Sequence, residues 1–150
     1  MTLRTFDRLR LALSVGGLVV AGYLTLLHYN RDVPLVCSHN GIVDCATVLG
    51  SPAAMLFGFP VAAWGLLWFA GAVVLAIASL RALRRGHRDP VRGVALAYVL
   101  GGTAFILYLL YQELGVIGRI CAWCTVVHVI VLALLVVQVL SDPMRAPGRD

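Results

Sequence analysis

The chain has 150 residues, of which 61% are hydrophobic and 13% are charged, and its formal net charge is +5. A soluble domain is about half apolar and about a quarter charged, so this composition excludes an ordinary soluble protein. It indicates an integral membrane protein, and we expect a single membrane domain over residues 1–150.

Four apolar runs extend over approximately residues 11–29, 58–80, 94–114 and 120–140. Each is close to the ~20 residues that a helix needs to cross ~30 Å of hydrocarbon. Lipid cannot satisfy exposed backbone groups, and the runs are too long for barrel strands. The sequence therefore predicts an all-α integral membrane fold: a four-transmembrane-helix bundle with an outer loop and a short helix as its cap. No cleavage site follows the first run, so we interpret it as a span and not as a signal peptide.

The arginines indicate the orientation of the bundle. All twelve basic residues are arginine; ten lie near the N-terminus, in residues 81–92 or in the tail, and only Arg31 and Arg119 lie in the other two loops. The positive-inside rule then places both termini in the cytoplasm and the other two loops on the periplasmic or extracellular side. This bias, with lipid headgroup contacts, accounts for the net charge, so no nucleic acid partner is indicated. The abundance of Ala, Gly, Val, Leu and Arg without Lys suggests GC-rich bacterial coding and therefore an inner (cytoplasmic) membrane.

The outer loop over residues 30–57 divides into an irregular part and a short helix. Asp44 is a favoured N-cap, so a helix is expected over residues 45–49. Cys45 would lie in its first turn, where the helix dipole stabilises a thiolate. Gly50-Ser51-Pro52 ends this helix, and Pro60 is acceptable in the first turn of the second span.

Turns are expected at two further places. Asp89-Pro90 makes the cytoplasmic turn, and residues 115–118 make a tight outer turn. The outer end of the third span carries polar and aromatic side chains that form an interfacial belt, pack in the bundle or line a ligand pocket: Tyr108, Tyr111, Gln112 and Glu113. Of these, we assign Tyr111 to the candidate pocket.

Cys121-Ala-Trp-Cys124 opens the last apolar run. Residues three apart on a helix share a face, so the two sulfurs can close a small disulfide ring. The helix N-terminus and Arg119 should lower the pKa of Cys121. A purely structural bridge would stabilise little across so short a loop, so this pair is expected to be redox-active.

Cys37 and Cys45 have seven residues between them in the outer loop. This spacing suits a second, mobile disulfide, and alternatively a structural staple in an oxidising compartment. The combination with a membrane-edge C-x-x-C pair favours a relay in which a disulfide passes between the pairs by thiolate attack. A third interpretation, four thiolates that bind zinc or an iron–sulfur cluster, is disfavoured by the wide loop spacing, and we expect no metal.

His128 lies on the same stripe of the fourth span as the two last cysteines. Ionisable groups within a membrane usually face the bundle interior. Its imidazole would either hydrogen-bond or protonate a carbonyl ligand, or make a buried hydrogen bond to a neighbouring helix. His28 and His39 are expected at the interface.

Together these residues resemble the vitamin K epoxide reductase family and its bacterial homologues. The resemblance rests on Cys37-x7-Cys45, Ser51 six residues further on, Phe57-Gly58 before the second span, and Cys121-x-x-Cys124. It covers nearly the whole chain and implies a quinone-linked thiol oxidoreductase whose helices surround a quinone headgroup.

The resemblance also implies the role of each residue. Cys37 and Cys45 would exchange electrons with a thioredoxin-fold partner, Cys45 would react with Cys121, and Cys124 would face the quinone. Two further residues would line the quinone pocket: Ser51 and Phe57.

The sequence departs from the animal members of the family at two positions that bear on the ligand carbonyls. Animal members have Tyr at the position of His128 and Asn at the position of Ala54. We therefore expect reduction of an ordinary quinone, menaquinone or ubiquinone, driven by a separate thioredoxin-fold (DsbA-like) thiol oxidase. The alternatives are a vitamin K quinone or epoxide reductase proper, and a non-enzymatic membrane protein with structural or metal-binding cysteines.

Overall fold

The computed structural model describes residues 2–30, 32, 34–37, 41–85 and 91–145, with side chains only as far as residue 142 at the C-terminal end. The predicted turn at Asp89-Pro90, His39, Arg31 and the tail arginines lie outside these described residues or side chains. The elements in chain order are α1 (Leu3–Tyr29), α2 (Cys45–Leu49), the 3₁₀ turn η1 (Pro52–Ala54), β1 (Met55–Leu56), β2 (Phe59–Pro60), α3 (Val61–Arg84), α4 (Arg92–Tyr111), the π-helical η2 (Gln112–Ile117) and α5 (Ala122–Arg145).

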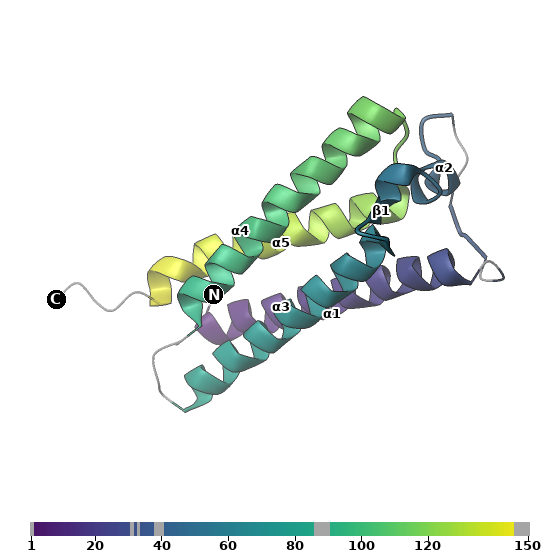
Figure 1. The fold of residues 1–150 in the computed structure, drawn as a ribbon. Coiled ribbons are helices and arrows are strands. Elements are labelled where there is room, and N and C mark those ends of the chain that lie inside the picture. The colour runs from purple at the N-terminus through teal and green to yellow at the C-terminus, as the bar shows by residue number, and fades with distance from the viewer. Residues whose placement is uncertain (1, 31, 33, 38–40, 86–90, 146–150) are drawn as a thin grey trace.

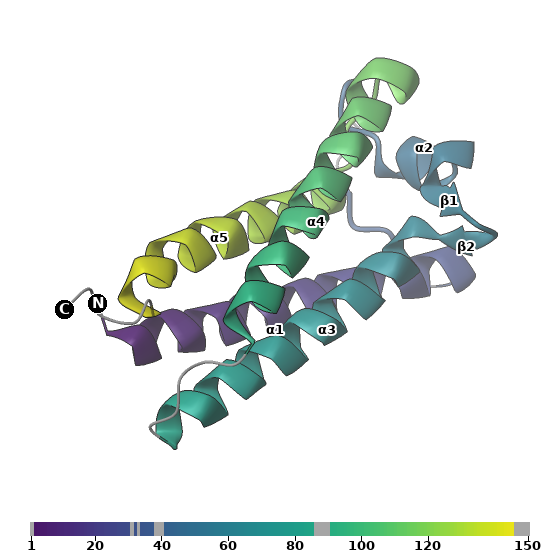
Figure 2. The same ribbon diagram turned by 60° about the vertical axis from the view of Figure 1, so that its left-hand side comes forward.

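Four helices of the described chain are long and apolar enough to cross a membrane, which confirms the predicted four-helix bundle. They run lengthwise past one another (Figure 1), with α2 and the β1–β2 hairpin gathered at one end of the bundle (Figure 2). We call this the cysteine end. The opposite end, where α1 begins and α5 finishes, is the terminal end. Helix α1 begins at Leu3 and not near residue 11, because the Thr2 side chain caps it by accepting the Thr5 N–H.

Close packing of α1 against α3 forms the centre of the bundle. Phe69 of α3 is 1% exposed, and its ring fills the space that a Cβ at Gly17 of α1 would need. The Trp68 ring stacks on Tyr98 of α4 with centroids 5.2 Å apart. Large apolar side chains such as Val19 and Leu67 point outward, as expected for helices in lipid.

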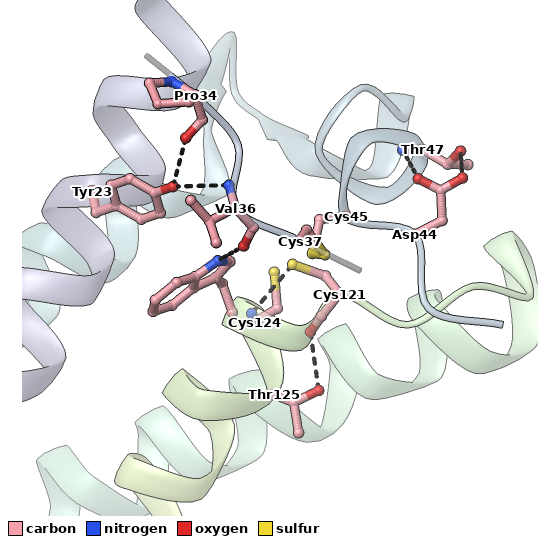
Figure 3. The surroundings of a disulfide bond; sticks show 11 residues. Tyr23, Pro34, Val36, Cys37, Asp44, Cys45, Thr47, Cys121, Cys124 and Thr125 are labelled. Carbon is pink, nitrogen blue, oxygen red and sulfur yellow. Dashed lines mark hydrogen bonds between the residues drawn. A yellow bond between two sulfur atoms is a disulfide. The ribbon is translucent and has the colours of Figure 1, made fainter. Parts of the chain in front are cut away.

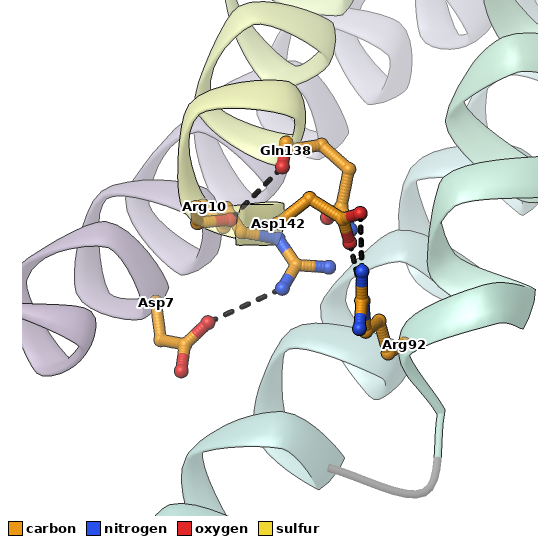
Figure 4. Close-up of polar contacts among 6 residues, drawn as sticks. Asp7, Arg10, Arg92, Gln138 and Asp142 are labelled. Carbon is orange, nitrogen blue, oxygen red and sulfur yellow. Dashed lines mark hydrogen bonds and ion pairs between the residues drawn. The ribbon is translucent and has the colours of Figure 1, made fainter. Parts of the chain in front are cut away.

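The terminal end is closed by charged side chains (Figure 4). Arg92 at the start of α4 makes two hydrogen bonds of 2.6 Å to the carboxylate of Asp142 in α5. Arg10 and Asp7, both buried in α1, are joined at 3.2 Å. The Asp7–Arg10 pair compensates two buried charges within α1, whereas the Arg92–Asp142 pair joins α4 to α5.

The cysteine end departs from the prediction at two boundaries. Residues 55–60 form an antiparallel hairpin in which Leu56 pairs with Phe59. Its turn uses positive φ at Phe57 and Gly58, and the second span therefore begins at Val61 and not at residue 58. The π-helical η2 continues the third span through Ile117, so most of the turn expected at residues 115–118 is helical. Gly118 caps η2 with a left-handed φ of +67°.

Candidate functional site

The four cysteines meet at the cysteine end (Figure 3). Cys37 and Cys45 form a disulfide, and Cys121 and Cys124 are free thiols. Cys45 and Cys121 are both 0% exposed and belong to one buried cluster, against which Cys37 and Cys124 pack. The structure thus brings the loop disulfide and the membrane-edge thiols together.

Backbone pairing explains why Cys45 and Cys121 are neighbours. The Ile120 N–H donates to the Ile42 carbonyl, and the Asp44 N–H donates to the Ile120 carbonyl, each at 3.0 Å. Cys45 directly follows one paired segment, and Cys121 directly follows the other. Asp44 also caps α2 as predicted, since its Oδ1 accepts the Thr47 N–H at 3.0 Å.

A second set of hydrogen bonds holds the segment before Cys37. The Trp123 Nε1–H donates to the Val36 carbonyl at 2.8 Å. The Tyr23 hydroxyl donates to the Pro34 carbonyl at 3.0 Å and accepts the Val36 N–H at 3.4 Å. We call Tyr23 and Trp123, whose rings meet edge to face at 5.2 Å, the aromatic clamp. The loop is therefore tied to α1 and α5 just before Cys37, and to Ile120 just before Cys45.

Cys121 occupies the residue immediately before α5. The Cys124 N–H donates to the Cys121 Sγ at 3.2 Å. A hydrogen bond from the Cys124 thiol is the main cause that lowers the pKa of Cys121, and burial opposes it. A lowered pKa favours the thiolate, the nucleophilic form in disulfide exchange.

A cavity of about 670 Å³ lies beside the thiols. Its wall is largely apolar and includes the indoles of Trp64 and Trp68. Cys124 lines it, and His128 lies on the same wall with 3% exposure and no hydrogen-bond partner for Nδ1 among the described residues. The size and lining are those of a small-molecule site.

The predicted pocket residues divide into two groups. Ser51 and His128 line the cavity. Phe57 does not: it is 84% exposed, because it forms the tip of the hairpin. Tyr111 is 66% exposed and also points away, because residues two apart on a helix face opposite sides, and Glu113 faces the cavity.

Sequence reasoning did not single out Glu113 as a site residue. It is 4% exposed, lines the cavity, and its Oε2 has no hydrogen-bond partner among the described residues. An acidic residue inside an apolar span was the signal that could have identified it. His28, expected at the interface, also lines the cavity. Within the described part of the chain, no group of three or more His, Cys, Asp or Glu side chains is arranged to hold a metal ion.

The chain was compared with models of known protein families. The model of the Vitamin K epoxide reductase family matches residues 8–139, which include both cysteine pairs and all four long helices in large part.

Proposed function

Because the chain belongs to the vitamin K epoxide reductase family, whose members are membrane oxidoreductases, we propose that it is a quinone-dependent thiol-disulfide oxidoreductase. It would reoxidise a separate thioredoxin-fold (DsbA-like) protein and pass the electrons to membrane menaquinone or ubiquinone. The observation that carries this proposal is the contact between two cysteine pairs, of which one member, Cys124, lines an apolar cavity.

The exposure of the sulfurs supports an order of reaction. Cys45 is 0% exposed and Cys37 is only partly buried, so a partner thiolate would attack Cys37, and Cys45 would leave as the thiolate. A second partner thiol would then release the partner as a disulfide. Two electrons would now be held by Cys37 and Cys45 as thiols.

The internal step would follow when Cys121 and Cys124 are a disulfide. Cys45 attacks Cys121, with which it is packed, and Cys124 leaves. Cys37 then attacks Cys45, which restores the loop disulfide and leaves two thiols at the start of α5. The pairing in the structure, a loop disulfide beside two free thiols, corresponds to the state that precedes quinone reduction.

The cavity would receive the quinone headgroup. Cys124 lines it, so this sulfur would pass electrons to the ring, and the Cys121–Cys124 disulfide would form again. The His128 Nδ1 has no partner among the described residues and could hydrogen-bond a quinone oxygen. Ser51 lies on the same wall, where its hydroxyl donates to the Val48 carbonyl at 2.8 Å.

The proposed location is the bacterial inner membrane with both termini in the cytoplasm. The arginine distribution supports this orientation, and α1 begins and α5 finishes at the end of the bundle opposite the cysteines (Figure 1). The thiol chemistry would then take place on the periplasmic side, where disulfides persist.

The test is quinone reduction by the purified protein in detergent, driven by a reduced DsbA-like protein or by dithiothreitol and followed by quinone absorbance. We expect turnover in the wild type and none in Cys124→Ser. Thr125→Ser, a conservative change on the same turn of α5, serves as the folded control. Vitamin K epoxide is assayed in parallel, and its faster reduction would favour the second candidate, an epoxide reductase proper, which the family description suggests. A folded protein that reduces neither substrate would point to structural cysteines.

A further inference from the structure

Glu113 is the acidic side chain of the described cavity wall, and no step above uses it. It lies in the π-helical η2, the last part of the third span, which is followed by the segment that leads to Cys121. π-Helical turns inside membrane or soluble helices are rare and frequently occur at functional sites. The backbone is held there, because the Arg119 N–H donates to the Glu113 carbonyl at 3.1 Å.

The Glu113 carboxyl lies next to the membrane-edge cysteines. Two polar groups that interact with it are the Cys121 backbone N–H and the Cys124 thiol. Its Oε2 is buried and has no hydrogen-bond partner among the described residues. A buried carboxyl oxygen without a partner is costly and rare, so it calls for an explanation beyond packing.

The titratable groups of the cavity wall limit the candidates for proton transfer. In the described residues they are His28, Tyr98, Glu113, Cys124 and His128. The Tyr98 hydroxyl already donates to the Trp68 carbonyl at 3.0 Å. Of the other four, Glu113 interacts with both cysteines of the membrane-edge pair.

We propose that Glu113 carries a proton from the Cys124 thiol to a quinone oxygen; this inference rests on the proposed quinone reduction. Oxidation of Cys121 and Cys124 releases two electrons and two protons as the S–S bond forms. The quinone takes up two electrons and two protons to become a quinol. The Cys124 S–H bond breaks as a proton binds the Glu113 carboxylate, and that O–H bond then breaks as the proton reaches the quinone. The second proton exchanges with water: Cys121 releases it, and the other quinone oxygen takes one up.

The decisive variant is Glu113→Gln, which keeps the size of the side chain and one acceptor oxygen but cannot carry a proton. Proton transfer by a positioned side chain typically contributes 10²–10⁴-fold, so we expect the single-turnover rate of quinone reduction by the reduced protein to fall about 100-fold. The quinone KM should change little. Glu113→Asp, which keeps the acid, should recover part of the rate.

A second half-reaction distinguishes this role from structural support. Without quinone, the reduced partner protein should transfer electrons to the Cys121–Cys124 disulfide equally fast in wild type and Glu113→Gln, because that exchange does not need the carboxyl. A Glu113 that merely positions the segment before Cys121 would slow both half-reactions. Asp7→Asn, the same acid-to-amide change at the buried terminal end, should alter neither half-reaction.

The outcomes separate this inference from the proposed function. Quinone reduction in the wild type together with an unchanged rate in Glu113→Gln, or equal losses in both half-reactions, would overturn the proton-transfer role alone. A folded wild type that reduces no quinone would overturn both proposals. Selective loss of the quinone half-reaction in Glu113→Gln, with recovery in Glu113→Asp, is the expected result.

Discussion

The two cysteine pairs differ in what surrounds them. The loop pair is a disulfide on a short segment tied by hydrogen bonds to α1 and α5, outside the membrane spans. The pair at the start of α5 consists of thiols, and its second member lines an apolar cavity. One pair is therefore suited to a water-soluble protein and the other to a lipid-soluble molecule, although their sulfurs lie in one cluster.

The two pairs are alike in one respect: in each, one cysteine is more deeply buried than the other. Each has one sulfur that is 0% exposed, Cys45 or Cys121, and one that is only partly buried, Cys37 or Cys124. Cys45 and Cys121 belong to one buried cluster, and Cys37 and Cys124 pack against its edge. In the proposed reaction this arrangement would shield the internal exchange from external thiols, and each substrate would react with a different, partly buried cysteine.

The largest effect is expected when the loop pair alone is disabled. Cys37→Ser should abolish turnover with the reduced partner protein, because the sulfur that the partner attacks is missing. Quinone reduction driven by dithiothreitol should continue, since a small reductant can act on Cys121 and Cys124 without the loop disulfide. Both rates are measured by quinone absorbance on the same preparation. Partner-driven turnover retained in Cys37→Ser would show that electrons enter elsewhere.

This comparison also shows which parts of the site follow from local sequence. The spans, the N-cap at Asp44 and a disulfide between Cys37 and Cys45 were predicted, because apolar length, capping preference and cysteine spacing are read over short distances. Contacts between segments that are distant in the sequence were not predicted. The bond from Trp123 to Val36 joins residues 87 positions apart, and no local pattern encodes it.

The directions of individual side chains at the pocket were also predicted incorrectly. Tyr111 and Glu113 stand two residues apart at the end of the third span, and the sequence favoured the aromatic residue for the pocket. The helix rotates about 100° per residue, so only one of the two can face the cavity, and the packing of α4 against α5 decides which. Phe57 was likewise assigned to the pocket, whereas the hairpin directs it outward.

The aromatic clamp should affect electron transfer through Cys37 and Cys45 but not quinone reduction by Cys121 and Cys124. Tyr23→Phe removes the hydroxyl that contacts Pro34 and Val36 but keeps the ring against Trp123. A hydrogen bond contributes about 1 kcal/mol, so we expect partner-driven turnover to fall about fivefold. Dithiothreitol-driven turnover should be unchanged. Tyr29→Phe, an exposed tyrosine of the same helix, is the matched control; equal losses in both assays for Tyr23→Phe would contradict a role confined to the loop.

The smallest effect concerns the protonation of Cys121, where the two pairs meet. The hydrogen bond from the Cys124 thiol lowers the pKa of Cys121, so the thiolate persists at a pH where an ordinary cysteine, with a pKa near ~8.5, is mostly protonated. As the pH falls through the lowered pKa, the thiolate is protonated and its attack on a disulfide slows. Ultraviolet absorbance of the thiolate against pH, measured with both loop cysteines replaced by Ala, gives the midpoint directly. Cys124→Ala removes the donor and should move that midpoint upward, whereas Cys124→Ser keeps a hydroxyl donor and should move it less. Equal midpoints in the two variants would mean that another feature, such as the start of α5, sets the reactivity of Cys121.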